Sequence, residues 1–203
     1  MRNGFTLIEM LIVIAITAVL AGFSIIYTRV GQNQIALSIE ESKIAQLILE
    51  AKELSIATYS EHAATCAYGV QFNYASSTYS LFAYNDAASS PDYPGRMICP
   101  SIASTSAAVD TSAVSEYAGG SWQVHTAPGV LLQSSADPIA SDTIQDVLFY
   151  PPNPCTLISF DGAMFQSACP PDTGTPTGYV YLTTIDGSAA TTISVSPGGQ
   201  VGL

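Results

Sequence analysis

One carboxylate stands inside an apolar run near the start of the chain. Glu9 follows Leu7-Ile8, and the residues from Met10 to Tyr27 are apolar except for Thr17, Gly22 and Ser24. A carboxylate in the middle of a bilayer costs roughly 2–4 kcal/mol, so such groups usually have a partner. Glu9 is therefore the residue whose type and position point most directly to a function.

The apolar run around Glu9 is long enough to cross a membrane. Counted from Phe5 it has about 23 residues, or about 35 Å as a helix. A cleavable secretory signal is the alternative, since Ala15, Ala18 and Ala21 supply small residues. The length of the run and the position of Glu9 within it favour an uncleaved helix. We therefore predict a transmembrane or polymerisation helix over residues 5–29.

The residues around Glu9 resemble a known junction. Gly4-Phe5-Thr6-Leu7-Ile8-Glu9 is similar to the class III leader junction of bacterial type IV pilins and type II secretion pseudopilins. The resemblance implies that residues 1–4 are a leader cleaved after Gly4 and that Phe5 is then N-methylated. It also implies four kinds of partner: other pilin or pseudopilin subunits, a prepilin peptidase and methylase, an inner-membrane assembly platform, and membrane lipid.

By the same resemblance, Glu9 neutralises the N-terminal amine of a neighbouring subunit. An α-amino group has a pKa near 8 and is mostly cationic at neutral pH. Its attraction to a carboxylate is much stronger in a low dielectric than in water. A pair within one chain stays open, because Phe5 and Glu9 are one helical turn apart, about 6 Å along the axis. Phe5 and Glu9 are the predicted assembly residues.

The charge pattern bears on location and partners. Arg2 and the short N-terminus predict a cytoplasmic amino end. The protein is then a single-pass inner-membrane protein with its head outside the cytoplasm, and later part of an extracytoplasmic filament. The net charge is −11, and the only basic residue beyond 62 is Arg96. A head this acidic repels phosphate and lacks the basic patch that nucleic acids require, so no nucleic-acid partner is expected.

Four cysteines lie in the head, at Cys66, Cys99, Cys155 and Cys169. An even number in an exported domain suggests two disulfides, for which three connectivities exist. Cys155 and Cys169 flank one strand-turn-strand stretch, which favours the pairs Cys155–Cys169 and Cys66–Cys99. No two cysteines lie within four residues, so a zinc site is not expected.

Signals for catalysis and for bound cofactors are weak. The sequence has no Gly-x-Ser-x-Gly, P-loop or Gly-x-Gly-x-x-Gly motif. His62 and His125 are isolated, and a membrane-anchored hydrolase that uses either of them is a distant alternative. Asp137, Asp142 and Asp146 form a loose acidic cluster whose spacing matches no EF-hand. We expect no enzyme activity, no metal and no cofactor.

A second helical pattern follows the apolar run. Residues 30–61 predict an amphipathic helix whose apolar stripe packs on the sheet of the head. A coiled coil with a partner helix is the alternative use of the stripe. The charged residues Glu40, Glu41, Lys43, Glu50, Lys52 and Glu53 lie largely off it. The stripe consists of Leu37, Ile44, Leu47, Ile48, Ala51, Leu54 and Thr58.

Residues 62–203 predict a β-rich head, interrupted by an irregular loop over 85–120 that is rich in Ser, Ala, Asp and Pro. A hairpin is expected over 68–74 and 78–84. Further strands are expected over 122–133, 145–150, 156–160, 178–185 and 192–195. Pro197-Gly198 predicts a type II turn before the last strand. The fold class is thus α+β: a long helix, half membrane and half amphipathic, packed on an antiparallel sheet, as in pilins.

The head sharpens the resemblance. The segments 50–56, 68–72 and 193–201, together with Ile158-Ser159-Phe160-Asp161-Gly162, are similar to the GspH/FimT group of minor pilins and pseudopilins. We therefore expect a minor pilin or pseudopilin that assembles through its N-terminal helix into a type IV pilus or a type II secretion pseudopilus. A pilus-tip, adhesin-like subunit that binds through the loop 85–120 is the main alternative.

Overall fold

The computed structural model describes the first helix and most of the head. Backbone is described for residues 7–61, 67–84, 88–89, 97–98, 107–108, 114–116, 123–134, 142–151, 155–162, 164–167 and 177–203. Side chains are described for these residues except at 24–30, 58–61, 84, 88–116, 123, 155 and 164–167.

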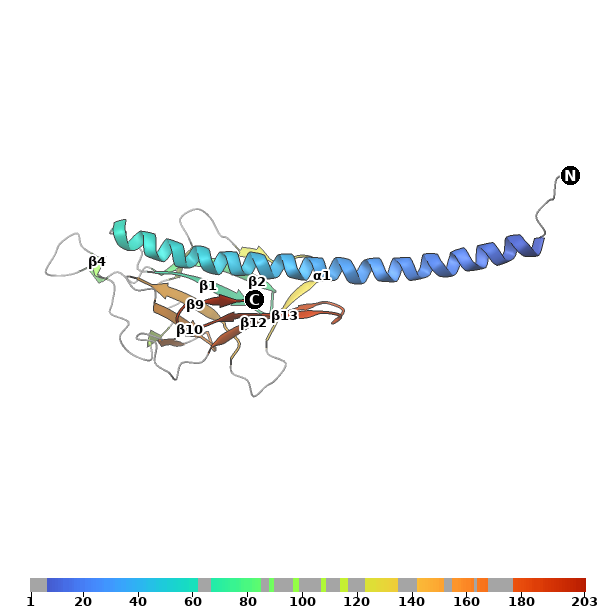
Figure 1. Cartoon of the computed structure of the whole chain (residues 1–203). Coiled ribbons are helices and arrows are strands. Elements are labelled where there is room, and N and C mark those ends of the chain that lie inside the picture. The colour runs from blue at the N-terminus through green and yellow to red at the C-terminus, as the bar shows by residue number, and fades with distance from the viewer. Residues whose placement is uncertain are drawn as a thin grey trace.

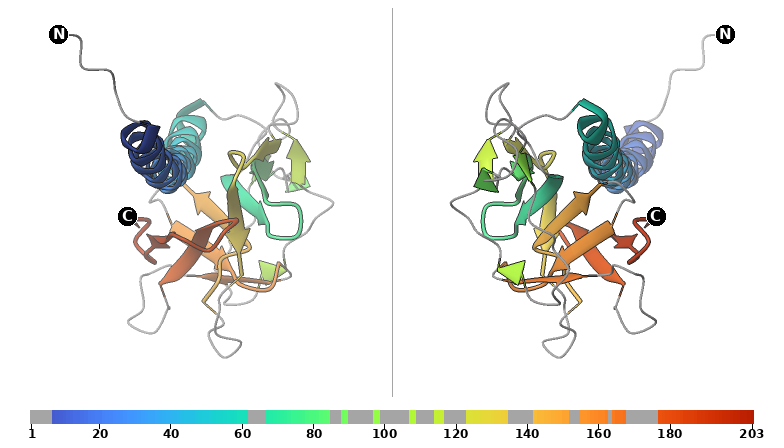
Figure 2. Two further views of the ribbon diagram at one scale, coloured as in Figure 1. Left: turned by 90° about the vertical axis from the view of Figure 1, so that its right-hand side faces the viewer. Right: turned by 90° about the vertical axis from the view of Figure 1, so that its left-hand side faces the viewer.

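A single helix, α1 (Leu7–Glu61), forms the N-terminal part of the protein. No proline occurs before Pro91, so no residue forces the helix to stop. The helix passes through Gly22 and Gly31 without a break. Its second half lies along the head and its first half projects beyond it (Figure 1). The head lies on one side of the helix, as the end-on views show (Figure 2).

The described strands of the head form three antiparallel sheets. An eight-stranded sheet has the order β5-β11-β10-β9-β1-β2-β6, with β7 also paired to β2. A four-stranded sheet has the order β14-β13-β12-β8, and β3 pairs with β4. The α+β class predicted from the sequence is confirmed. The bounds are β1 Ala67–Asn73, β2 Thr78–Tyr84, β3 Ala88–Ser89, β4 Met97–Ile98, β5 Ala107–Ala108, β6 Val114–Glu116, β7 Gln123–His125, β8 Val130–Gln133, β9 Asp146–Tyr150, β10 Cys155–Ser159, β11 Met164–Ser167, β12 Gly178–Thr184, β13 Ala190–Val195 and β14 Val201–Gly202.

Several predicted strands are present. The hairpin of β1 and β2 pairs Ala67 with Tyr84 and Asn73 with Thr78, around a turn at 74–77. Strands β9, β10 and β12 fall on the segments expected over 145–150, 156–160 and 178–185. Four short strands, β3 to β6, lie within 85–120, where an irregular loop was expected. Of these, β5 and β6 extend the large sheet at its two ends.

The single strand expected over 122–133 is wrong. The segment forms two strands in different sheets: β7 pairs with β2, and β8 pairs with β12. A turn separates them, in which the Val130 amide donates to the Ala127 carbonyl (2.9 Å) and Gly129 has a φ of 91°. Pro128 and Gly129 favour this turn, because proline fixes φ and glycine accepts the left-handed conformation.

The type II turn expected at Pro197-Gly198 is also wrong. The Gly199 amide does donate to the Ser196 carbonyl (2.8 Å), so the turn is in the expected place. A type II turn needs a positive φ at Gly198, but the positive φ (69°) is at Gly199. A type I turn followed by one left-handed residue has this pattern, and it is common in hairpins.

The helix and the two larger sheets share one hydrophobic core. The helix contributes Leu37, Ile44, Ile48 and Ala51, which are all buried. Leu47 and Leu54 of the predicted stripe are partly buried, and the side chain of Thr58 lies outside the described part. Burial of this face attaches α1 to the head. The strands contribute a larger set, which includes Val70, Phe72, Tyr79, Val130, Leu132, Val147, Phe149, Ile158, Val180, Leu182, Ile193 and Val195.

Candidate assembly surface

The described side chains of the projecting half of α1, from Leu7 to Phe23, are nearly all apolar. Every described side chain from Leu7 to Phe23 is exposed, and the large apolar ones are 50–83% exposed. Thr17 directs its hydroxyl to the carbonyls of Val13 and Ile14 (2.9 and 3.0 Å), so its polar group is satisfied within the helix. An apolar surface of this size on a helix that leaves the head requires a lipid or protein environment.

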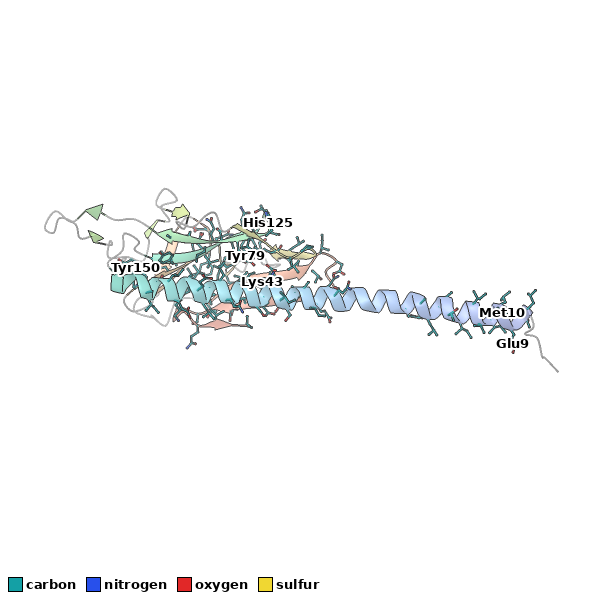
Figure 3. The ribbon with its side chains drawn as sticks, turned by 90° about the horizontal axis from the view of Figure 1, so that it is seen from above. Glu9, Met10, Lys43, Tyr79, His125 and Tyr150 are labelled. Atoms are coloured by element: carbon teal, nitrogen blue, oxygen red, sulfur yellow. The ribbon has the colours of Figure 1, made fainter. Side chains whose placement is uncertain are left out.

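Glu9 lies at the far end of this half, beside Met10 (Figure 3). It is exposed and is the acidic residue of the first turn, where the helix dipole stabilises a negative charge. Gly4 and Phe5, the predicted processing residues, lie outside the described part of the chain. The predicted pairing of Glu9 with the amine at Phe5 is therefore still a prediction.

Within the described residues, no helix combines the length and the apolar character needed to cross a membrane. The segment predicted over 5–29 extends at both ends beyond the described side chains, at 5–6 and 24–29. The membrane-spanning prediction is not confirmed.

The docked half of α1 has a second apolar face, which points away from the head. Ile35, Ile39, Leu49 and Ile56 are 46–63% exposed. At 100° per residue they fall on one side of the helix, roughly opposite Ile44, Ile48 and Ala51. We call these four residues the outer stripe. A soluble monomer rarely leaves such a row of large aliphatic side chains uncovered.

A buried carboxylate joins the inner face of α1 to the large sheet. Glu40 has no exposed surface, although its charge placed it off the stripe in the sequence analysis. The Tyr79 hydroxyl donates to Glu40 Oε1 (2.7 Å), and Lys43 Nζ lies 3.3 Å from Oε2. Burial, and then the adjacent Glu40, raise the pKa of Tyr79. Lys43 and Tyr79 lie over the head in Figure 3. This contact fixes the position of α1 along its own axis relative to the large sheet.

Four further polar contacts fasten the same half of the helix. Asn33 donates to Asp186 (2.9 Å), Thr191 donates to Glu41 (2.8 Å), and Lys52 donates to the Gly199 carbonyl (2.9 Å). All three reach the β12–β14 end of the chain. The buried Ser55 hydroxyl donates to the Phe149 carbonyl (2.6 Å) and accepts from the Tyr68 amide (2.9 Å). The docked half is thus held rigidly to the head.

The other predicted site residues do not form a catalytic or metal site in the described part of the chain. His125 is exposed on the short strand β7 (Figure 3). His62, Asp137, Cys66, Cys99 and Cys169 lie outside the described residues. Cys155 begins β10, but its side chain is not described, so the disulfide prediction is untested. No group of three His, Cys, Asp or Glu side chains that could hold a metal occurs among the described residues.

Asp146 is the most perturbed acid of the described head. It is 1% exposed, and one of its oxygens, Oδ1, lacks a hydrogen-bond partner. Burial raises the pKa of Asp146 to about 6; a hydrogen bond from Gln71 lowers it, and the charge of Asp161 raises it further. Asp142 accepts from the Tyr181 hydroxyl (3.1 Å). Asp146 begins β9 and Asp142 lies four residues before it, so both acids sit near one end of this strand.

Two features of the docked half were not predicted from the sequence: the burial of Glu40 and Ser55, and the outer stripe. Glu40 and Ser55 follow the three- and four-residue steps of the apolar stripe, between Leu37 and Ile44 and after Ala51. That spacing was the available signal that both are buried. The outer stripe repeats at the same steps on the opposite side, but polar residues at 42, 46 and 53 interrupt it.

Comparison with known proteins gives one finding, at the N-terminus. Residues 1–25 match the family described as the prokaryotic N-terminal methylation motif. No curated protein and no solved structure matches the chain. The matched residues contain the predicted cleavage site, Phe5, Glu9 and most of the projecting half of α1.

Proposed function

We propose that this chain, which carries the N-terminal motif of type IV pilin-like subunits, is a minor pilin or pseudopilin. It assembles through its N-terminal helix into a type IV pilus or a type II secretion pseudopilus. The observation that carries the proposal is the coincidence of the methylation motif at residues 1–25 with the fully exposed apolar half of α1. The subunit has a structural role and is not an enzyme.

The motif implies that a prepilin peptidase processes the chain and that other pilin subunits are its partners. Before assembly the apolar half of α1 anchors the subunit in the inner membrane, with the head outside the cytoplasm. In the filament the same half packs against helices of neighbouring subunits. Phe5 and Glu9 then set the register, because a buried ammonium and carboxylate are stable only when they meet.

The outer stripe extends this surface along the docked half. Ile35 and Ile39 continue the apolar surface beyond the point where the head begins, and Leu49 and Ile56 carry it to the end of α1. Burying four such side chains contributes roughly 1–2 kcal/mol each. A neighbouring helix would therefore find apolar side chains at intervals along the docked half, between the polar residues at 42, 46 and 53.

The first test is the mass of the N-terminal peptide of the protein from its native membrane. The proposal predicts a chain that begins at N-methylated Phe5. A chain cut after the alanines near residue 21 would show ordinary secretion and would contradict the proposal.

The second test uses the charge of Glu9. Glu9→Gln keeps the size of the side chain and is expected to abolish incorporation into filaments, measured by shearing and immunoblotting. Glu53→Gln is the matched control, since Glu53 is also an exposed glutamate of α1. Equal incorporation of the two variants would rule out the assembly role of Glu9.

A further inference from the structure

The tip of the β12–β13 hairpin lies beside α1 where the helix leaves the head. Asn33 Nδ2 donates to Asp186 Oδ2 (2.9 Å), which fixes the tip at the level of Asn33. Figure 1 shows this hairpin reaching towards the projecting half of the helix, whereas the C-terminus lies over the middle of the head. The tip is therefore the part of the described head nearest to the apolar half of α1.

The tip presents exposed apolar side chains. Ile185 is 71% exposed, and Leu131 on the neighbouring strand β8 is 38% exposed. Leu131 pairs with Thr183, and two residues later Ile185 continues this pairing beyond the end of β12, since its amide donates to the Gly129 carbonyl (2.8 Å). Such diagonal neighbours lie roughly 7–8 Å apart or less. The two side chains thus form a small exposed apolar patch at the tip.

The tip is nearly uncharged in a strongly acidic protein. Residues 126–134 and 183–192 contain one charged side chain, Asp186. Its carboxylate accepts from Asn33, from the Ser188 amide (3.1 Å) and from the Ser188 hydroxyl (2.7 Å). This surface therefore meets a zwitterionic lipid layer with little repulsion.

The height of the tip matches the polar layer of a bilayer. Asn33 is the seventh residue after Ile26, which lies near the end of the apolar run, and this is about 10 Å along a helix. The headgroup layer is roughly 5–8 Å thick on each side. A tilt of about 20°, which is ordinary for membrane helices, lowers the head side by a few ångströms. Ile185 then reaches the headgroup layer.

We infer that, before assembly, the hairpin tip rests in the headgroup layer of a zwitterionic bilayer, with Ile185 leading and Leu131 behind it. The inference rests on the proposed function, because the height of the tip is set by insertion of the projecting half of α1. The contact holds the head in one orientation about the helix axis while the subunit waits in the membrane.

Single-tryptophan probes in the full-length protein test this contact. In a Trp122→Phe background, tryptophan is placed at Phe23, Ile185 or Leu203, and each variant is reconstituted in phosphatidylcholine–phosphatidylethanolamine vesicles that contain shallow brominated lipids. Leu203 is the matched control, because it is 72% exposed and is the C-terminal residue, which lies over the middle of the head and away from the tip (Figure 1). Interfacial segments sit about 5–10 Å into the lipid boundary, so we expect roughly twofold quenching of the Ile185 probe. The Leu203 probe keeps its emission.

The three probes separate failure of the inference from failure of the proposed function. A quenched Phe23 probe with an unquenched Ile185 probe overturns the inference and leaves membrane insertion intact. Equal quenching at Ile185 and Leu203 also overturns it, since the head then lies on the lipid without a preferred face. An unquenched Phe23 probe removes the membrane stage of the proposed function, and the inference with it. A blue shift at Ile185 that depends on protein concentration and not on quencher assigns the tip to a second copy and contradicts the lipid contact.

Discussion

The two halves of α1 belong to one continuous helix but meet opposite environments. In the projecting half, every described side chain from Leu7 to Phe23 is exposed and nearly all are apolar. In the docked half, one face is buried against both large sheets and the other carries the outer stripe. The projecting half therefore needs partners outside the chain, whereas the inner face of the docked half already has its partners in the head.

The difference shows where specificity lies. Among the described side chains from Leu7 to Phe23, Glu9 is the only charged one, so partners of this stretch are selected by one charge and by shape. The docked half uses Glu40, Ser55 and three further polar contacts to fix one arrangement on the head. Buried polar groups of this kind are costly when mispaired, so they disfavour alternative packings. The position of the head relative to Glu9 is therefore set by the docked half.

Loss of side-chain volume is expected to give the largest difference in stability between variants of the two halves of α1. Ile48 is fully buried, and Ile48→Ala should lower the free energy of unfolding of the head by about 2–5 kcal/mol through lost burial and a cavity. Ile12→Ala in the projecting half should change it by less than about 0.5 kcal/mol. Urea denaturation of the full chain in detergent measures both. Similar losses for the two variants would contradict the division of the helix.

A change of pH is expected to act on the head through Asp146. Because its folded pKa is raised from 3.8 to about 6, the protonated acid is favoured in the folded state. The resulting stabilisation is complete below about pH 4 and is lost as the pH rises through 6, with a size on the order of 2–3 kcal/mol. Denaturation midpoints between pH 4 and 7 measure it. Asp146→Asn should remove this part of the dependence, and an unchanged profile in that variant would exclude Asp146 as its source.

Loss of the buried hydroxyl next to Glu40 is expected to have a smaller effect. Tyr79→Phe leaves Glu40 Oε1 without its 2.7 Å donor in a fully buried position, which should cost about 1–3 kcal/mol. Thr191→Val removes a similar bond to Glu41, but in a half-exposed position, and should cost less than about 1 kcal/mol. Thermal unfolding of the two variants compares them. A larger loss for Thr191→Val would show that burial does not set the strength of these contacts.

Glycine replacements are expected to have opposite signs in helix and head, and the replacement in the helix gives the smallest effect. A Cβ at Gly22 meets no atom within 4 Å, so Gly22→Ala should stabilise the helix by up to about 1 kcal/mol. A Cβ at Gly69 would clash with the Val147 carbonyl and lie 2.6 Å from the Phe82 ring. Gly69→Ala should therefore destabilise the head. Hydrogen exchange in detergent measures protection of α1 and of the strands separately, and lower protection around Gly22 in its alanine variant would contradict the first expectation.

The sequence was sufficient for features that depend on local pattern. The α+β class, the β1–β2 hairpin and the inner apolar stripe follow from periodicity and turn residues. The two errors both lie at proline-glycine turns. Pro128-Gly129 divides the segment expected as a single strand, whereas after Pro197-Gly198 the left-handed conformation falls on Gly199. The sheet that β7 or β8 joins depends on its partner strand, β2 or β12, which is distant in sequence. A local pattern contains no information about such a partner.

The candidate site was predictable at its N-terminal end and not on the docked half. Glu9 stands out because its surroundings are uniformly apolar. Glu40 does not, because charged neighbours such as Glu41 and Lys43 conceal its position on the buried face. Burial of a carboxylate depends on Tyr79, which lies 39 residues away in sequence.

The contacts between α1 and the last strands impose an order on folding. Asn33, Glu41 and Lys52 meet partners that are 153, 150 and 147 residues further along the chain. Closing loops of this length is entropically slow, whereas the β1–β2 hairpin forms from neighbours. During synthesis and export the helix emerges first, β1 and β9 can then cover part of its inner face, and the part that faces β13 and β14 stays uncovered until the final hairpin is made. A chain stalled before residue 186 would thus expose the outer stripe together with the part of the inner face around Asn33, Glu41 and Lys52, and quality-control proteases could distinguish it from a finished subunit.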